Sequence, residues 1–173
     1  MWPQLGYCAE KARDMNGYGN NIWGPSNTLS RGMLAQIIYN RESRPSVTGD
    51  SPFADVADGA WYAEAVTWAA AHGVVVGYGN GRFGPNDPIT REQLAVMLYR
   101  YEQRSGGGFT GDWMFQLDYS DAANVSDWAY EAMCWRSMNG IVEGKGTGIL
   151  DPKGNATRAE AAAMLLRYFE PDR

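Results

Sequence analysis

Three arginines of this chain each follow a serine or threonine at the point where a helix is expected to begin. A helix N-terminus is the positive end of the helix dipole, so a cation there is mildly unfavourable. A cost repeated three times indicates a function for these side chains. Each arginine ends a stretch of similar pattern: GYGNNIWGPSNTLSR (17–31, Arg31), GYGNGRFGPNDPITR (77–91, Arg91) and GKGTGILDPKGNATR (144–158, Arg158).

Two kinds of chemistry fit an arginine at this place. Beside free helix N-terminal amides it is a good site for a carboxylate or phosphate, because the planar guanidinium and the backbone donors converge on one anion. The alternative is structural: each arginine pairs with an acidic residue of a neighbouring unit, such as Asp55 or Asp121, and joins two units. The residue types and their spacing leave both interpretations open.

The three loops belong to three sequence repeats. An offset of 60 residues aligns the first copy with the second, and an offset of 67 aligns the second with the third. Repeats at such periods are typical of units that pack on one another. We place them at 1–45, 46–105 and 106–173; the first lacks its N-terminal part, and most of the extra length of the third lies in the Gly-rich connection 105–118.

Each complete repeat is predicted to hold two helices. WYAEAVTWAAAHG (61–73) ends at a helix-terminating glycine, and a short buried extended run, 74–76, follows it. Thr90 with Gln93, and Thr157 with Glu160, match the capping box that begins a second helix. The apolar stripe of that helix is expected to be core, with Leu34, Ile37 and Ile38 in the first copy, Leu94, Met97, Leu98 and Tyr101 in the second, and Ala161, Met164, Leu165 and Tyr168 in the third.

These elements predict a mainly α fold. A unit of two short helices cannot bury its own apolar faces, so the three units must pack on one another. Closing around a shared axis would give a pseudo-threefold domain with equivalent clefts between neighbours. An extended solenoid is the other packing.

Composition and charge exclude several classes of partner. The net charge is −5 and no block is rich in Lys and Arg, so neither nucleic acid nor an anionic membrane surface is expected to bind. No apolar stretch reaches the roughly 18 residues of a membrane span, and neither membrane insertion nor a signal peptide is predicted for this chain. Cys8 and Cys134 lack metal or redox spacing and are expected to be small core residues, with a disulfide as the alternative.

No catalytic constellation is evident. His72 is the single histidine; it has no paired nucleophile motif and precedes a helix-ending glycine, so a surface or capping position is expected. The loop GNGRFGPND (79–87) lacks the regular aspartate spacing and the closing glutamate of a calcium loop. We therefore expect no enzymatic activity, no metal and no cofactor.

Residues 53–101 resemble the S-layer homology (SLH) domain in their F-x-D opening, their G-x-F-x-P loop and their I-T-R helix start. Their sequence is FADVADGAWYAEAVTWAAAHGVVVGYGNGRFGPNDPITREQLAVMLYRY. The third copy has the T-R-A-E tetrad intact at 157–160. The resemblance implies a pseudo-trimer around a central three-helix bundle. It also implies an extracellular module that attaches bacterial surface proteins to secondary cell-wall polysaccharide, often through a pyruvate ketal on a terminal N-acetylmannosamine.

The same resemblance implies roles for individual residues. A pyruvate ketal carries a carboxylate, which would be the anion at the arginines. Helix capping by the aspartates and core packing by the tryptophans are the alternatives. The implied set comprises Arg31, Arg91 and Arg158 as anion contacts, Asp55 and Asp121 as acceptors of sugar hydroxyls, and Trp61 and Trp128 as cleft walls.

Some positions depart from the family pattern. The first copy reads L-S-R-G-M (29–33) in place of I-T-R-A-E and has no F-x-D opening, and the third has Lys145 where the others have Tyr18 and Tyr78. Since only the middle copy has both a complete opening and an intact loop, Arg91 is expected to matter more than Arg31. The alternative function is a structural or protein-interaction module of a surface protein, whose clefts receive other surface-protein domains.

Overall fold

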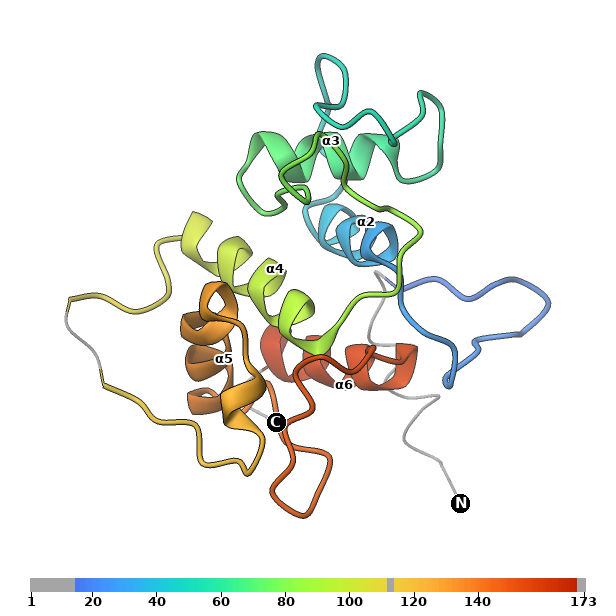
Figure 1. Ribbon diagram of the computed structural model, residues 1–173. Coiled ribbons are helices and arrows are strands. Elements are labelled where there is room, and N and C mark those ends of the chain that lie inside the picture. The colour runs from blue at the N-terminus through green and yellow to red at the C-terminus, as the bar shows by residue number, and fades with distance from the viewer. Residues whose placement is uncertain (1–14, 112–113, 171–173) are drawn as a thin grey trace.

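The computed structural model describes residues 15–111 and 114–170, and their regular secondary structure is helical (Figure 1). Across these ranges no β-strand occurs, and three isolated bridges are the extended pairings found. The predicted mainly α fold is confirmed. The elements are α2 (Arg31–Arg41), α3 (Ala63–Ala71), α4 (Arg91–Arg104), a 3-10 turn η1 (Ala122–Asn124), α5 (Asp127–Met138) and α6 (Arg158–Phe169).

Local sequence sets where α2, α4 and α6 begin. Ser30, Thr90 and Thr157 are N-caps with extended backbone, and each side-chain oxygen accepts a backbone N–H three residues further on. Thr90 and Thr157 form complete capping boxes with Gln93 and Glu160. The three arginines therefore stand at the first position of a helix, as the sequence predicts.

A closed ring of backbone hydrogen bonds joins the three repeats just before these helices. The Leu29 N–H donates to the carbonyl of Ala156, that of Ala156 to Ile89, and that of Ile89 to Leu29, each at 2.9 Å. The three residues occupy the same repeat position, and all are fully buried. Each copy is thus bonded to both of the others.

Three antiparallel bridges repeat the same cycle on either side of this ring. They pair Thr28 with Thr157, Ser30 with Pro88, and Thr90 with Asn155. An extended solenoid has no such contact between its first and third units. The contacts support the pseudo-threefold arrangement; the superposition of the three units on one axis stays a prediction.

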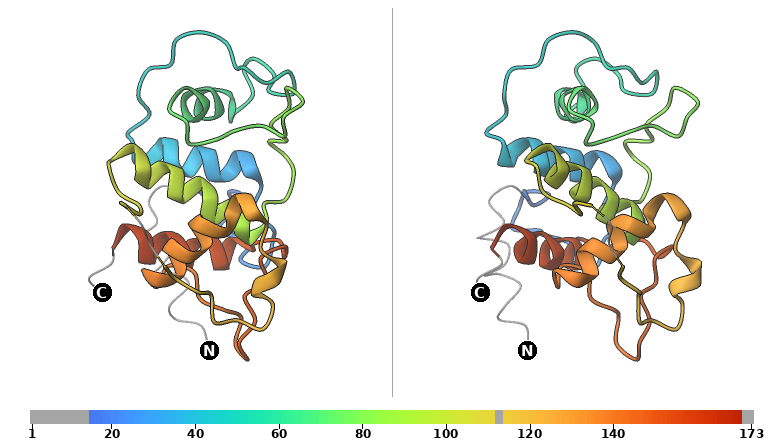
Figure 2. Two further views of the ribbon diagram at one scale, coloured as in Figure 1. Left: turned by 60° about the vertical axis from the view of Figure 1, so that its left-hand side comes forward. Right: turned by 90° about the vertical axis from the view of Figure 1, so that its left-hand side faces the viewer.

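Figure 2 shows α2, α4 and α6 side by side in the middle of the molecule. One repeated pair of positions links neighbouring helices at their C-terminal ends. The three contacts at these positions are Tyr101 donating to Glu42 (2.5 Å), Tyr168 donating to Glu102 (2.6 Å), and the Arg41 guanidinium over the ring of Phe169 (4.5 Å).

The outer helices pack across the repeat boundaries. α3 packs on α2 and α5 packs on α4, so the second helix of one copy holds the first helix of the next. Tyr39 meets Trp68 with ring centroids 5.8 Å apart, and Tyr99 meets Trp135 at 5.7 Å. No single copy therefore buries its apolar faces alone.

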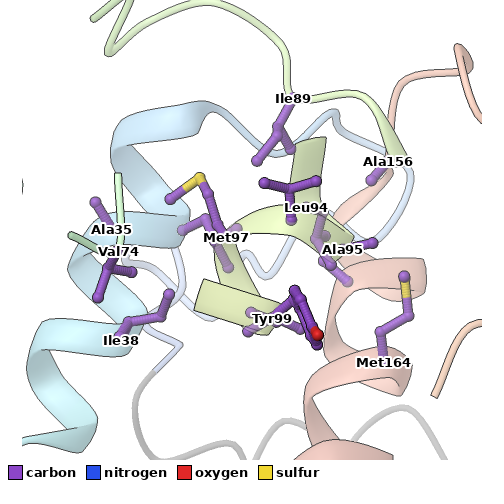
Figure 3. Packing of buried hydrophobic residues seen from close by; sticks show 14 of the residues in the cluster. Ala35, Ile38, Val74, Ile89, Leu94, Ala95, Met97, Tyr99, Ala156 and Met164 are labelled. Carbon is purple, nitrogen blue, oxygen red and sulfur yellow. The ribbon is translucent and has the colours of Figure 1, made fainter. Parts of the chain in front are cut away.

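The core formed by these helices contains most of the predicted stripe residues (Figure 3). Tyr101 and Tyr168 are half-buried, since their hydroxyl groups reach glutamates near the surface. In the run 74–76 the third residue, Val76, is 52% exposed, so the prediction that the whole run is buried is wrong there. Cys134 is a buried free thiol, as predicted, and Cys8 lies outside the described residues.

Candidate functional site

Three clefts lie between the repeats, and each is lined by one of the three arginines. We call them the Arg31 cleft, the Arg158 cleft and the Arg91 cleft; their volumes are about 440, 200 and 240 Å³. Each cleft combines an arginine of one copy with the loop and the second helix of the next copy. The Arg31 cleft uses the middle copy, the Arg158 cleft the first, and the Arg91 cleft the third.

The Arg31 guanidinium is bound by the loop of the middle copy. Its Nε donates to the carbonyl of Phe83 at 2.8 Å, and its Nη2 donates to the carbonyl of Val76 at 3.2 Å. The guanidinium carbon lies 4.7 Å from the ring centroid of Tyr78 and 4.6 Å from that of Phe83. Nη1 makes no hydrogen bond with any residue of the described ranges, so it is the nitrogen left for a ligand.

The other two arginines repeat this geometry. Nε donates to the carbonyl of Trp23 for Arg158 (2.9 Å) and to that of Leu150 for Arg91 (3.0 Å). Nη2 of each donates to the carbonyl that opens the same loop, at 2.7 Å in both copies. The arginines do join the units, through carbonyl groups rather than through Asp55 or Asp121. Within the described ranges, Arg91 alone among them also pairs with an acidic residue of the next copy, Glu160, at 3.6 Å.

The helix N-terminal amides are not free. The Arg31 N–H donates to the carbonyl of Asp87 at 3.0 Å, and the Gly32 N–H donates to that of Pro85 at 2.8 Å. The amides at the starts of α4 and α6 are bonded to the next loop in the same way. The prediction of free N-terminal donors is wrong, because the loop of the neighbouring copy already accepts them.

Both predicted tryptophans stand in the cleft walls. Trp128 lines the Arg31 cleft and Trp61 lines the Arg158 cleft, and each is 56% exposed. Each comes from the copy that supplies neither the arginine nor the loop of its cleft. A large aromatic side chain left this exposed is suited to contact a ligand rather than to fill the core.

The two aspartates hold loops in place. Asp55 accepts the backbone N–H groups of Phe83 and Gly84, both at 2.8 Å. Asp121 does the same in the third copy, accepting from Leu150 and Asp151 at 2.7 and 2.8 Å. Neither aspartate is among the residues that line the three clefts. Their geometry therefore favours a loop-fastening role over contact with sugar hydroxyls. Asp121 stands at the N-cap position of η1, but its side chain makes no capping hydrogen bond there.

The Arg91 cleft differs in chemistry from the other two. Lys145 occupies the position of Tyr18 and Tyr78, whose rings lie under the guanidinium groups of Arg158 and Arg31. Lys145 instead forms ion pairs with Asp151 at 2.6 Å and with Glu160 at 3.5 Å. The hydrogen bond with Asp151 raises the pKa of Lys145.

Glu160 also forms an ion pair with the arginine of that cleft. The Arg91 Nη1, the atom equivalent to the unbonded nitrogen of Arg31, lies 3.6 Å from Glu160. Since Glu160 and Asp151 neutralise the cations of this cleft, an anionic ligand would have to compete with them.

The sequence analysis ranks Arg91 above Arg31, and the structure contradicts the reason for that ranking. That ranking pairs each arginine with the loop of its own copy, whereas each arginine lies against the loop of the next copy. The complete middle copy therefore builds the Arg31 cleft. Arg31, not Arg91, stands in the cleft with the intact loop.

Sequence reasoning missed three residues that line the Arg31 cleft: Tyr78, Gln93 and Arg100. Gln93 uses its Oε1 to accept the Thr90 N–H at 3.2 Å, which leaves its amide nitrogen for a ligand. Tyr78 could have been found from the sequence, because the third copy has lysine at the position where the other two copies have tyrosine. Arg100 carried none, since it lies nine residues into α4.

Other classes of site find little support. His72 ends α3, where its Nδ1 lies 2.7 Å from the Trp68 carbonyl on an exposed surface, as predicted. Within the described ranges no group of three or more His, Cys, Asp or Glu residues is arranged to hold a metal ion. None of the described helices combines the length and the apolar character needed to cross a membrane.

Comparison with known proteins gives a family for two of the three repeats. The sequence model of the S-layer homology domain matches residues 52–95 and 118–162. These ranges hold two of the three loops that build the clefts. The match includes the aspartates and tryptophans discussed above.

Similar chains occur in larger proteins. The chain is 34% identical to an amylopullulanase of Thermoanaerobacterium thermosulfurigenes over 90% of its length, and 28% identical to the surface-layer 125 kDa protein of Lysinibacillus sphaericus over 95%. It is 25% identical to the cellulosome-anchoring protein of Acetivibrio thermocellus over 97%. The chain spans 8%, 14% and 38% of these relatives.

Proposed function

Because this chain belongs to the S-layer homology domain family, we propose that it is a non-catalytic module that anchors a surface protein to bacterial secondary cell-wall polysaccharide. Relatives named as surface-layer and cellulosome-anchoring proteins support anchoring at the cell surface. The ligand is the pyruvylated terminal sugar of the polymer, held in the clefts between repeats. The Arg31 cleft is the principal site, and the Arg158 cleft is a second, smaller one.

The observation that carries this proposal is the Nη1 nitrogen of Arg31. It belongs to a guanidinium that the protein positions with two hydrogen bonds, and it has no partner among the described residues. Arg31 as a whole residue is only 6% exposed, so a carboxylate bound there would be partly shielded from water. Trp128, in the wall of the same cleft, offers a ring to the apolar face of the sugar.

Arg31 would serve both as a joint and as a ligand contact. The joint uses Nε and Nη2, and the ligand uses Nη1. The two carbonyl groups take one N–H of Nε and one of Nη2, so Nη1 is the guanidinium nitrogen that has no hydrogen bond with the described residues. One charged donor, supplemented by the Gln93 amide, is therefore the proposed recognition element for the ketal.

The direct test compares two forms of one glycan. We expect the protein to bind a purified wall fragment that carries the terminal pyruvate ketal. Removing the ketal by mild acid should weaken binding about tenfold or more, since a hydrogen bond to a charged group is lost. Calorimetric titration measures both affinities. Equal affinity for the two forms would exclude the ketal as the recognised group.

A second prediction concerns the cleft wall. Trp128→Ala should weaken binding of the pyruvylated fragment about three- to tenfold, because an aromatic contact with the sugar is removed. Stability should change by no more than about 0.5 kcal/mol, since the side chain is exposed. Trp61→Ala is the matched control, with the same exposure beside the smaller Arg158 cleft. A Trp128→Ala protein that unfolds more easily but binds normally would show that the ring is a packing residue.

A further inference from the structure

The Arg31 cleft contains a second arginine. Arg100 comes from the third turn of α4 and lines the cleft together with Arg31. It is half-buried, and none of the hydrogen bonds or ion pairs among the described residues includes it. Burial lowers the pKa of its guanidinium, and no acidic residue offsets that effect. The group stays charged at neutral pH, because arginine titrates so far above it.

No carboxylate lines this cleft to balance the two cations. Tyr78 and then Asp87 are the groups that most raise the pKa of Arg31 against the effect of burial, and the Asp87 carboxylate accepts the Tyr78 hydroxyl at 2.9 Å. Arg100 itself lowers the pKa of Arg31, so the two guanidinium groups are close enough to repel each other. Two like charges beside one cavity are unfavourable unless a ligand of opposite charge joins them.

The residue at the position of Arg100 differs in the other two clefts. In the Arg91 cleft it is Arg167, whose Nη2 forms an ion pair with Glu143 at 2.5 Å. In the Arg158 cleft it is Asn40, a neutral residue. Arg100 is thus the one member of the three that adds an unpaired positive charge to its cleft. The Arg31 cleft is also the largest, and its 440 Å³ lies in the range typical of sites that enclose a ligand.

We propose that the Arg31 cleft selects a glycan segment with two acidic groups, one at Arg31 Nη1 and the other at Arg100. This inference rests on the proposed function, because it takes the ketal carboxylate as the first acid. The second acid is a carboxylate or a phosphate on the adjoining part of the polymer. Arg100 is then the residue that distinguishes a doubly acidic chain end from a singly acidic one.

The test uses three synthetic fragments of one sugar sequence. The first carries the pyruvate ketal alone, the second the ketal and a phosphate on the next sugar, and the third the ketal and a uronic carboxylate there. Each is titrated calorimetrically into wild type, Arg100→Gln, Arg100→Lys and Arg167→Gln. Arg167→Gln is the matched control, since it removes the same side chain from the same helix position in the Arg91 cleft.

Wild type should bind at least one doubly acidic fragment about tenfold or more tightly than the ketal-only fragment. Arg100→Gln should abolish that preference, so that the three fragments bind this variant with affinities within about twofold of one another. Arg100→Lys should keep part of the preference, because the charge remains. Arg167→Gln should keep all of it. Whichever of phosphate and carboxylate gives the preference identifies the second acid.

Two results would overturn the inference alone: wild type binding all three fragments equally, or Arg100→Gln weakening all three by the same factor. The second result would show that Arg100 supports the cleft instead of reading a second acid. Failure of wild type to bind any fragment would overturn the proposed function as well. Thermal unfolding of each variant confirms that it is folded before it is titrated.

Discussion

Arg31→Ala should abolish the tightest binding of pyruvylated wall glycan, lowering affinity by roughly ten- to a hundredfold. The variant removes the charged donor that is left for the ligand, and such an interaction contributes about 1.5–3 kcal/mol. Calorimetric titration with the pyruvylated fragment measures the loss. The effect should shrink when the ketal has been removed from the glycan, because the variant and the wild type then lack the same contact.

Arg91→Ala is the matched control for this experiment. Arg91 makes the same two hydrogen bonds to carbonyl groups of the next copy, so the two variants should lose similar stability in urea unfolding. Its Nη1 already lies near Glu160, and its cleft has an ion-paired lysine in place of tyrosine. We expect Arg91→Ala to lose no more than about threefold in affinity. Equal losses of affinity in the two variants would contradict the assignment of the Arg31 cleft as the principal site.

Asp55→Ala should give a large loss of stability, about 3 kcal/mol or more. The carboxylate accepts two backbone N–H groups, and Phe83 and Gly84 are buried, so the substitution leaves two donors without partners. For a chain of this size that corresponds to a fall in Tm of roughly 6–12 °C. Asp58→Ala, which removes the same charge from an exposed position three residues further on, should change Tm very little.

The same contact sets a pH dependence. The hydrogen bonds from Leu150 and Asp151 lower the pKa of Asp121. In Asp55, burial acts to raise the pKa, but the hydrogen bonds from Phe83 and Gly84 outweigh burial, so the pKa of Asp55 is lowered as well. A carboxyl group whose pKa is lower in the folded state stabilises the protein above its unfolded pKa, near 4. That contribution should be lost as the pH falls below about 4 through the folded values.

Urea unfolding between pH 3 and pH 7 measures this dependence. Wild type should lose stability more steeply on acidification than Asp55→Ala, which lacks one of the two groups. Parallel pH curves for the two proteins would show that Asp55 is not the fastening group that its hydrogen bonds indicate.

The features that could be predicted from the sequence are those set by residues close together in the chain or repeated in each copy. The starts of α4 and α6 depend on residues three positions apart, so the capping boxes were visible in the chain itself. The exposure of Trp61 and Trp128 in the cleft walls agrees with the role that the family resemblance implies. These features are either local or repeated.

The partners of the arginines could not be predicted in the same way. An offset of 60 or 67 residues shows that two positions are equivalent, but not which copy each one faces. The carbonyl groups that accept from Arg31 belong to residues 45 and 52 positions away, and a carbonyl leaves no trace in the residue type. Arg100 was missed for a similar reason, because a charged residue on a helix is ordinarily a solvated one.

The ring of three hydrogen bonds between Leu29, Ala156 and Ile89 fixes the number of copies. In a linear array the terminal units keep unused edges, so a gene can gain or lose one unit at a time. Here every backbone N–H of the ring already has a carbonyl acceptor in another copy. A fourth copy would therefore find no free N–H and no free carbonyl at this position. Losing one copy would expose a buried donor and a buried acceptor together. The unit that duplication can pass on intact is therefore the whole triplet.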